Sequence, residues 1–308
     1  MLPEHGIGLE EAGHRAMRRA ALASVTVAAI LIGAKLAAWL LSGSVALFGS
    51  LLDSSLDLVA SLVTLFVVGQ ALLPPDSNHR FGHGKAEGLG ALFQAAVISG
   101  SAVFLLMEAL GRLSAPQPVE RAPLGIAVSG LAIVLSLALV AYQRHVARRT
   151  GSVAIAADSI HYAGDLLLNA GVILALVANA WFGVTIVDPL FALAIAAFLG
   201  WNAWGLARRA IDMLMDREWP EDERERIIGM VLANPAVAGV HELKTRTSGT
   251  NAFIQFHIAL DPEMTLAKAH TIADEIEGVL GEHYPHAEIL IHMDPLGLAE
   301  HEQLNGYE

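Results

Sequence analysis

The chain has 308 residues and contains no cysteine. This absence excludes a disulfide framework, a thiolate zinc finger, an iron–sulfur cluster and a catalytic thiol. Any metal that the protein binds must therefore be held by histidine, carboxylate or carbonyl groups. Such ligands suit Zn²⁺, Mn²⁺, Fe²⁺ or Co²⁺ better than Cu⁺.

Charged residues are scarce as well. They make up 16% of the chain, against about 25% in an ordinary soluble domain, while 54% of the residues are hydrophobic and the mean hydropathy is +0.51. This composition is typical of a membrane protein. The net charge of −12 falls wholly on residues 216–308, which carry 6 basic and 18 acidic residues, because the remainder carries 13 of each. An acidic segment disfavours nucleic acid as a partner and suits a cationic ligand.

Long apolar stretches predict a membrane domain over residues 20–215. A helix needs about 20 residues to cross a hydrocarbon core about 30 Å thick, and six stretches are long enough: 20–41, 45–73, 87–110, 123–143, 153–179 and 187–208. The first is too long for the core of a signal peptide, so we expect an uncleaved helix after a cytoplasmic N-terminal segment, residues 1–19.

The distribution of basic residues predicts the orientation of these spans. Arg112 and Arg121 lie in a segment on one side. The other side carries eleven: Arg15, Arg18, Arg19, Arg80, Lys85, Arg144, Arg148, Arg149, Arg208, Arg209 and Arg217. The positive-inside rule then places both termini in the cytoplasm, in agreement with an even number of spans.

Residues 216–296 have the patterns of a small soluble domain. An amphipathic helix is expected before Pro235, followed by two alternating segments joined at a Ser-Gly-Thr turn, a second amphipathic helix and a last strand. The order αββαβ predicts a compact two-layer α+β domain. We expect residues 297–308 to form a flexible tail.

Two pairs of ionisable residues lie inside predicted spans. Asp53 and Asp57 are four residues apart in the second span, and His161 and Asp165 have the same spacing in the fifth, so each pair shares one helix face. A carboxylate in hydrocarbon is costly unless a cation or a water-filled cavity compensates it. If the faces meet, three carboxylates and one imidazole satisfy a tetrahedral Zn²⁺. The alternative is polar contact between helices with protonated acids, although such contacts usually involve Asn, Ser or Thr.

Three other polar residues of the spans are less specific. Lys35 lies inside the first apolar stretch, and we expect its long side chain to reach outward as a membrane anchor. Asn169, one turn beyond Asp165, suits a hydrogen bond between helices. Asp158, one turn before His161, either lines the inner mouth of a pathway or is an acid at an interfacial helix start.

Two further groups of residues are candidate metal ligands. The loop after the second span holds Asp76, His79 and His83 at a spacing that can surround a small cation, although two histidines in a short polar loop also occur by chance. The soluble domain holds His241, His257, His270, His292 and Asp294, which either converge on metals or are separately solvated. The remaining histidines fall in polar or terminal segments and are expected on the surface: His5, His14, His145, His283, His286 and His301.

Several of these segments, spread in order over residues 20–296, resemble the motifs of one known family. They are DSSLD, DSNHRFGHGKAE, ADSIHYAGD, HELKTRTSG, FIQFHIAL and ILIHMDP. In them the chain is similar to the cation diffusion facilitator family, particularly its bacterial zinc and iron efflux members. The resemblance implies six transmembrane helices in the bacterial inner membrane, a cytoplasmic ferredoxin-like domain, and a homodimer that exchanges a divalent cation for protons.

The resemblance also implies residue roles. The transport site comprises Asp53, Asp57, His161 and Asp165, and a loop site comprises Asp76, His79 and His83. A cytoplasmic dinuclear site comprises His241, His257, His270 and His292, with Asp294 as the bridging ligand. Lys85 and Asp216 form an interlock where the membrane and soluble parts of the dimer join. Many zinc-selective relatives have His where this chain has Asp53, so the choice between Zn²⁺, Cd²⁺ and Fe²⁺ stays open.

Together these features predict a proton-coupled antiporter that exports divalent transition metal, chiefly Zn²⁺, and also holds Zn²⁺ as a structural or regulatory ion. Metal ligands must be deprotonated, so metal entry releases protons and protonation from outside expels metal, and His161 is the natural switching group. A passive metal channel and a membrane metal sensor are the alternatives. An intramembrane hydrolase is disfavoured, because neither H-E-x-x-H nor a Gly-x-Gly-Asp context is present.

Overall fold

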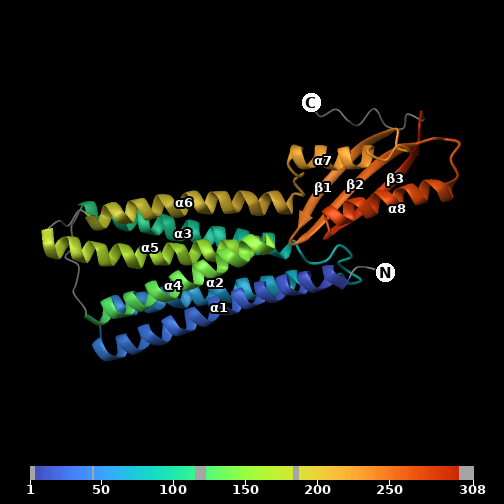
Figure 1. Cartoon of the computed structure of the whole chain (residues 1–308). Coiled ribbons are helices and arrows are strands. Elements are labelled where there is room, and N and C mark those ends of the chain that lie inside the picture. The colour runs from blue at the N-terminus through green and yellow to red at the C-terminus, as the bar shows by residue number, and fades with distance from the viewer. Residues whose placement is uncertain (1–3, 44, 115–122, 183–186, 298–308) are drawn as a thin grey trace. The chain divides into compact units, whose positions relative to one another are not determined.

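The computed structural model describes residues 4–43, 45–114, 123–182 and 187–297 and divides the chain into two compact units, Met1–Leu214 and Met215–Glu308. Within its described residues, the first unit consists of long helices that run side by side (Figure 1). These are α1 (Glu4–Ser42), α2 (Val45–Ala71), α3 (Ala86–Ser114), α4 (Pro123–Thr150), α5 (Val153–Phe182) and α6 (Val187–Leu214).

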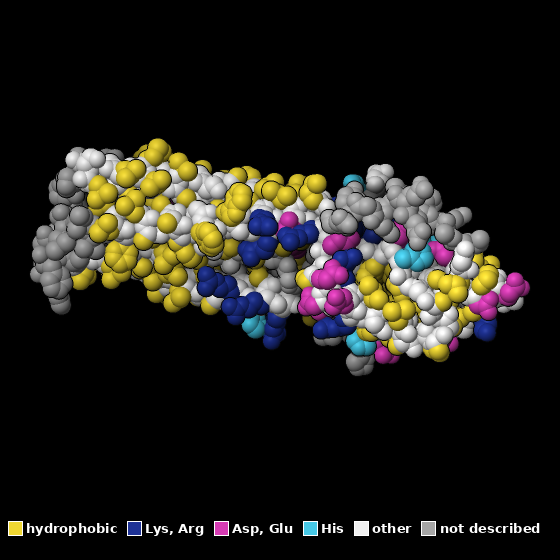
Figure 2. Space-filling view, turned by 90° about the horizontal axis from the view of Figure 1, so that it is seen from above, with side chains coloured by type: hydrophobic (Ala, Val, Ile, Leu, Met, Phe, Trp, Pro, Cys, Tyr) yellow, Lys and Arg dark blue, Asp and Glu magenta, His cyan; other side chains and the backbone are white. Residues whose placement is uncertain are grey.

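The surface of this helical unit suits a lipid environment. Over the described residues, α1, α2, α3, α4 and α6 are long and apolar enough to cross a membrane, and α5 is 30 residues long. Side chains such as Leu56, Phe66 and Phe104 are 65–69% exposed. On the face that Figure 2 shows, hydrophobic side chains accordingly cover most of the helical unit, and Lys and Arg side chains gather toward one end of it. The side chains of the last turns of α5 lie outside the described residues.

Helix α1 begins earlier than the apolar stretch that starts at residue 20. It starts at Glu4 and continues through most of the segment predicted to precede the membrane. The physical reason is packing, because Met17 is fully buried in a cluster that includes Val67 and Val146. The polar residues of this segment therefore form an exposed face of a helix that is anchored on its other face.

Helix α5 lies at the centre of the unit, in contact with each of the other five described helices. Its first turn is fixed by the buried carboxylate of Glu87, which accepts hydrogen bonds from Ser152 Oγ at 3.0 Å and from Val153 N at 2.9 Å. Gly164, next to Asp165, has no side chain and so lets α6 approach closely, because a Cβ at this position would lie 2.7 Å from Leu199. Residues in the middle of α5 are thus held inside the bundle.

The second unit confirms the predicted αββαβ order. Its elements are α7 (Glu221–Leu232), β1 (Gly239–Ser248), β2 (Asn251–Leu260), α8 (Leu266–His283) and β3 (Ala287–Pro295). The strands lie in the order β1-β2-β3, with β1 antiparallel and β3 parallel to β2 (Figure 1). The tail predicted after residue 296 lies outside the described residues from residue 298 onward.

One face of this sheet is covered and the other is available for ligands. Ile254, Phe256 and Ile258 alternate along β2 and form a single core with the buried residues of α7 and α8. Because side chains of a strand alternate between its faces, His257 lies on the opposite face.

Candidate metal sites

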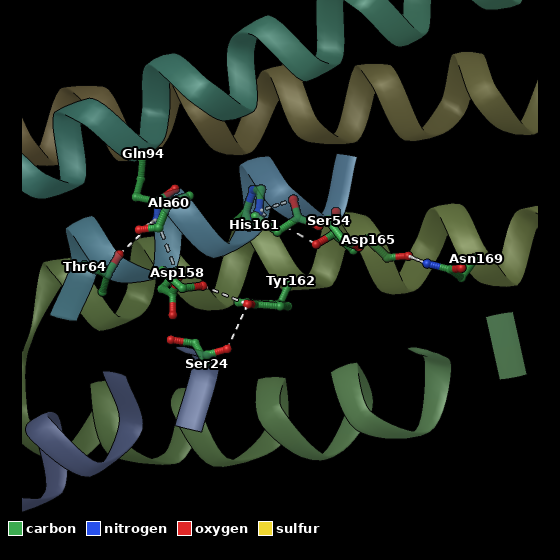
Figure 3. A network of polar contacts seen from close by, with 12 residues as sticks. Ser24, Ser54, Ala60, Thr64, Gln94, Asp158, His161, Tyr162, Asp165 and Asn169 are labelled. Atoms are coloured by element: carbon green, nitrogen blue, oxygen red, sulfur yellow. Dashed lines mark hydrogen bonds and ion pairs between the residues drawn. The ribbon is translucent and has the colours of Figure 1, made fainter. Parts of the chain in front are cut away.

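Helices α2 and α5 bring their ionisable faces together inside the helical unit. His161 Nε2 lies 3.1 Å from Asp57 Oδ1. It also lies 3.8 Å from Asp165 Oδ2, on the same helix (Figure 3). One ligand atom from each of these three residues lies within 4.8 Å of the other two. His161 is only 6% exposed. The three predicted ligands therefore form a compact cluster of one imidazole and two carboxylates.

Asp53 is outside this cluster but lines the same cavity. The cavity has a volume of about 140 Å³ and is also lined by Asp57 and Asp165, whereas one water needs only roughly 10–15 Å³ by the same measure. The space is thus sufficient for a metal ion with water, within reach of the exposed Asp53. Asn169 also lines the cavity, but its amide donates to the Asp165 carbonyl of its own helix at 2.8 Å rather than to another helix.

The expectation that Lys35 is an outward anchor is wrong. The residue is 6% exposed, and its ammonium donates hydrogen bonds to Ser54 Oγ at 2.5 Å and to the Ser50 carbonyl at 3.1 Å. It lines the same cavity as the acids. The sequence indicates a polar face on α2, because Ser50, Asp53, Ser54 and Asp57 share one face at helical spacing, but it does not show which residue contacts that face. A buried lysine on the adjacent helix is a natural partner for such a face.

Asp158 matches neither of its predicted roles, because it is completely buried in a polar network one turn from His161 (Figure 3). Its carboxylate accepts hydrogen bonds from Gln143 Nε2 at 2.5 Å and from Gln94 Nε2 at 3.4 Å. The Gln94 amide also donates to Thr64 Oγ1 at 2.9 Å. The carboxylate therefore joins α3, α4 and α5, and Gln94 extends the network to α2.

We expect Asp158→Ala to destabilise the protein, because the buried amide of Gln143 loses its acceptor, whereas Gln94 keeps Thr64 and the Ala60 carbonyl. Leaving such a buried group unsatisfied costs about 1–3 kcal/mol. Thermal unfolding of the detergent-solubilised protein should show a clear fall in melting temperature. Glu11→Gln is a suitable control, since it removes an exposed partner of Arg15 and such pairs contribute about 0–1 kcal/mol. Equal melting temperatures for both variants would mean that the network is not structural.

The loop between α2 and α3 brings its three predicted ligands together. Asp76 Oδ1 accepts backbone hydrogen bonds from Asn78 at 2.8 Å and His79 at 2.7 Å, which closes the loop and lowers the pKa of the Asp76 carboxyl. Its two oxygens lie 3.3 Å from His79 Nδ1 and from His83 Nε2. The Nδ1 atom of His83 is buried without a hydrogen-bond partner. An ionised carboxylate with two imidazoles is a fitting set of ligands for a small divalent ion.

Strand register aligns three histidines in the soluble unit. His241 on β1 is the register partner of His257 on β2, which is in turn the partner of His292 on β3. Asp294 follows two residues after His292 and so points to the same face. The sheet thus brings together, on its open face, candidate ligands that are far apart in the sequence.

Asp294 lies among all three imidazoles. Its Oδ2 is 2.9 Å from His257 Nδ1 and 3.1 Å from His241 Nε2, while its Oδ1 is 3.1 Å from His292 Nε2. Partial burial acts to raise the pKa of Asp294, but the hydrogen bond from His257 and the nearby imidazoles outweigh it and lower the pKa overall. The carboxylate is therefore ionised at neutral pH, with each oxygen directed toward a different set of nitrogens.

The remaining predicted residues are not part of these clusters. His270 is exposed on α8, where its Nδ1 lies 3.6 Å from Asp274, and its helix covers the opposite face of the sheet. Lys85 donates to the Leu214 carbonyl at 3.3 Å, and Asp216 lies 3.4 Å from Arg246. The roles of these three residues stay predictions.

Comparison with known proteins gives a consistent result over nearly the whole chain. Residues 21–215 match the cation efflux transmembrane domain, and residues 219–296 match the cytoplasmic domain of cation efflux proteins. The chain is 44% identical over 289 residues to the cation-efflux pump FieF of Yersinia enterocolitica, a match that covers 94% of this chain and 96% of that protein. Identity to FieF of Yersinia pestis is 43% with the same coverage.

Two solved structures are similar to the soluble unit alone. A structure of CzrB in its zinc form is 31% identical and covers 28% of this chain and 99% of that one, with a TM-score of 0.26. The metal-bound C-terminal domain of the CzcD transporter from Thermotoga maritima is 27% identical and covers 27% of this chain and all of that one, with a TM-score of 0.25.

Proposed function

Because the chain belongs to the cation efflux family, whose members are transporters and not enzymes, we propose that it exports Zn²⁺ in exchange for protons. Export of divalent metal by a multi-pass membrane protein with a cytoplasmic C-terminal domain follows from membership of the family. The identity of the metal and the coupling to protons are our proposal. We further propose the bacterial inner membrane as its location, with both termini in the cytoplasm.

The observation that carries the proposal is the cluster of Asp57, His161 and Asp165 in the middle of two apolar helices. Such a group of ionisable residues is costly inside a membrane unless it serves an ion pathway. With Asp53 in the same cavity, the group offers the four nitrogen and oxygen ligands that a tetrahedral Zn²⁺ requires. The absence of cysteine makes Cu⁺ an unsuitable substrate.

The position of His161 supports coupling to protons. Its Nε2 atom is the one that faces both Asp57 and Asp165, at 3.1 Å and 3.8 Å. An unprotonated Nε2 has a lone pair for the metal, whereas a protonated Nε2 donates to the two carboxylates instead. Metal and proton therefore compete for one atom, so protonation from outside releases the metal and metal entry from the cytoplasm releases the proton.

We propose that the loop cluster and the cytoplasmic cluster also bind divalent metal. The division of the Asp294 oxygens among His241, His257 and His292 supports a bridging role for this carboxylate between two Zn²⁺ ions. We propose a homodimer as the functional unit, with His270 contributing to the cytoplasmic site and Lys85 and Asp216 as its interlock. Bound cations would offset the repulsion between the two acidic domains.

Uptake of Zn²⁺, Cd²⁺, Fe²⁺ and Mn²⁺ into inside-out membrane vesicles tests the proposal. We expect Zn²⁺ to accumulate fastest and an acidic vesicle lumen to accelerate uptake, because lumenal protons exchange for the metal. Equal uptake with and without the proton gradient would favour a passive channel. Absence of uptake of every ion would favour a sensor.

Selectivity should depend on Asp53. In the variant Asp53→His, a directional nitrogen replaces a flexible carboxylate oxygen, so the site becomes more strictly tetrahedral and favours Zn²⁺ over the larger Cd²⁺. We expect the ratio of Zn²⁺ to Cd²⁺ uptake to rise severalfold in the same vesicles. An unchanged ratio would remove Asp53 from the set of ligands.

A further inference from the structure

A buried lysine shares the transport cavity with the three acids, and the proposed function gives it no role. Lys35 lies on α1 and is only 6% exposed, so its ammonium is shielded from solvent. The cavity of about 140 Å³ is lined by this side chain together with Asp53, Asp57 and Asp165. A lysine held in such a place contributes a full positive charge next to a site for a metal cation.

The hydrogen bonds of Lys35 join this charge to neutral oxygens of α2 and not to the acids. Its Nζ atom donates to Ser54 Oγ at 2.5 Å and to the Ser50 carbonyl at 3.1 Å, and both acceptors are neutral oxygens of α2. The carboxylate oxygens therefore stay available to a metal. The ammonium still acts electrostatically on Asp53 and Asp165 across the cavity.

The charges of the cavity then balance those of the substrate. Metal ligands must be deprotonated, so in the metal-binding state the three carboxylates, the ammonium and a neutral His161 give a net charge of −2. One divalent ion neutralises that charge, whereas a monovalent ion neutralises only half of it. Without the lysine the site would carry −3, and a divalent ion would bind more tightly and leave more slowly.

We propose that Lys35 is a fixed counter-charge of the transport site, which matches the site to a divalent ion and weakens its binding enough for release. The lysine positions charge and is not a ligand. This inference rests on the proposed function, because it assumes that Asp53, Asp57 and Asp165 surround the transported ion. It predicts that removal of a positive residue from the cavity improves metal binding and impairs turnover.

The test measures metal binding directly, by calorimetric titration of the detergent-solubilised full chain with Zn²⁺. All proteins carry Asp76→Ala and Asp294→Ala, which remove the shared carboxylate of each of the other two clusters. The variant Lys35→Gln keeps a hydrogen-bond donor for Ser54 and loses the charge, and Lys35→Arg keeps the charge. Binding that persists after Asp165→Ala is assigned to other sites and subtracted.

We expect Lys35→Gln to lower the dissociation constant for Zn²⁺ at least about tenfold, since the repulsion between a unit charge and a divalent ion exceeds a tenfold effect even over roughly 10 Å at an effective dielectric constant of about 20. Transport by the same variant in an otherwise unaltered chain should show a lower KM and a lower kcat. Lys35→Arg should stay within about twofold of the parent, because an exchange that keeps the charge leaves the Coulomb interaction in place. If Lys35→Gln does not fold, Lys35→Met replaces it.

Two results would overturn the inference, and they differ. If the parent binds Zn²⁺ at the transport site and the neutral variant binds it equally or more weakly, Lys35 serves only to join α1 to α2. If the parent itself binds no Zn²⁺ that depends on Asp165, the proposed transport site is wrong and the role of Lys35 is wrong with it.

Discussion

Replacing Asp57 or Asp165 by asparagine is expected to abolish metal transport while the protein remains folded. Both carboxylates face His161 Nε2 within the cluster, so either change removes a charged ligand and leaves a side chain of the same shape. Loss of a residue that only supports a ligand typically costs about 10–100-fold in affinity or activity. Loss of the ligand itself should therefore lower the uptake rate by at least about 100-fold.

A carboxylate on the same unit but away from the cavity provides the control. Glu108 pairs with Arg112 one turn along α3, and both side chains are substantially exposed. Glu108→Gln should leave the uptake rate within about twofold of the parent, since exposed ion pairs contribute little. All variants are compared at equal amounts of protein that elutes as a single species in size-exclusion chromatography. Parental rates in either site variant would contradict the assignment of the transport site.

Metal should also have a large effect on the stability of the soluble unit. This unit has its own core, in which Ile254, Phe256 and Leu280 are buried, so we expect the segment from residue 215 onward to fold when expressed alone. A ligand present at about 100 times its dissociation constant stabilises a protein by about 2.7 kcal/mol. In a domain of this size, 1 kcal/mol corresponds to about 4–8 °C. Saturating Zn²⁺ should therefore raise the melting temperature by about 10 °C or more.

The effect should depend on Asp294, which lies about 3 Å from a nitrogen of each of three histidines. The variant Asp294→Ala should lose most of the stabilisation by Zn²⁺. It should also lose the tightening of the dimer that we expect Zn²⁺ to produce, as measured by analytical ultracentrifugation. Glu277→Ala removes an exposed acid of α8 and should retain both effects. A metal-dependent rise in melting temperature that survives Asp294→Ala would show that the histidines bind metal without the carboxylate.

The sequence predicts the helices and the pairing of ionisable residues on one helix face well, because both depend on spacing along one element. Asp57 on α2 and the pair on α5 could be selected from their four-residue spacing in apolar segments. The structure places Asp57 of α2 and Asp165 of α5 close to His161. The αββαβ order of the soluble unit follows from alternation and amphipathic periodicity in the same way. These patterns involve residues that are close in the sequence, so they can be recognised without knowledge of the tertiary structure.

The roles of Lys35 and Asp158 could not be predicted in this way. Periodicity shows which residues share a helix face, but the rotation of each helix against its neighbours decides what that face contacts. Lys35 donates hydrogen bonds to two serines of α2, and Asp158 accepts hydrogen bonds from amides of α3 and α4. His270 shows the same limit for a predicted ligand. It belongs to the soluble unit, but its helix packs against the face of the sheet opposite to the histidine cluster.

The central claim is that metal and protons exchange at the cluster around His161, and simultaneous measurement of both fluxes tests it most directly. Proteoliposomes with a lumenal pH dye and a metal-sensitive dye, clamped at zero membrane potential, would report the two movements together. Addition of Zn²⁺ outside should make the lumen alkaline as Zn²⁺ enters, and vesicles with Asp57→Asn should show neither signal. Entry of Zn²⁺ at the full rate with no change in lumenal pH would contradict the account.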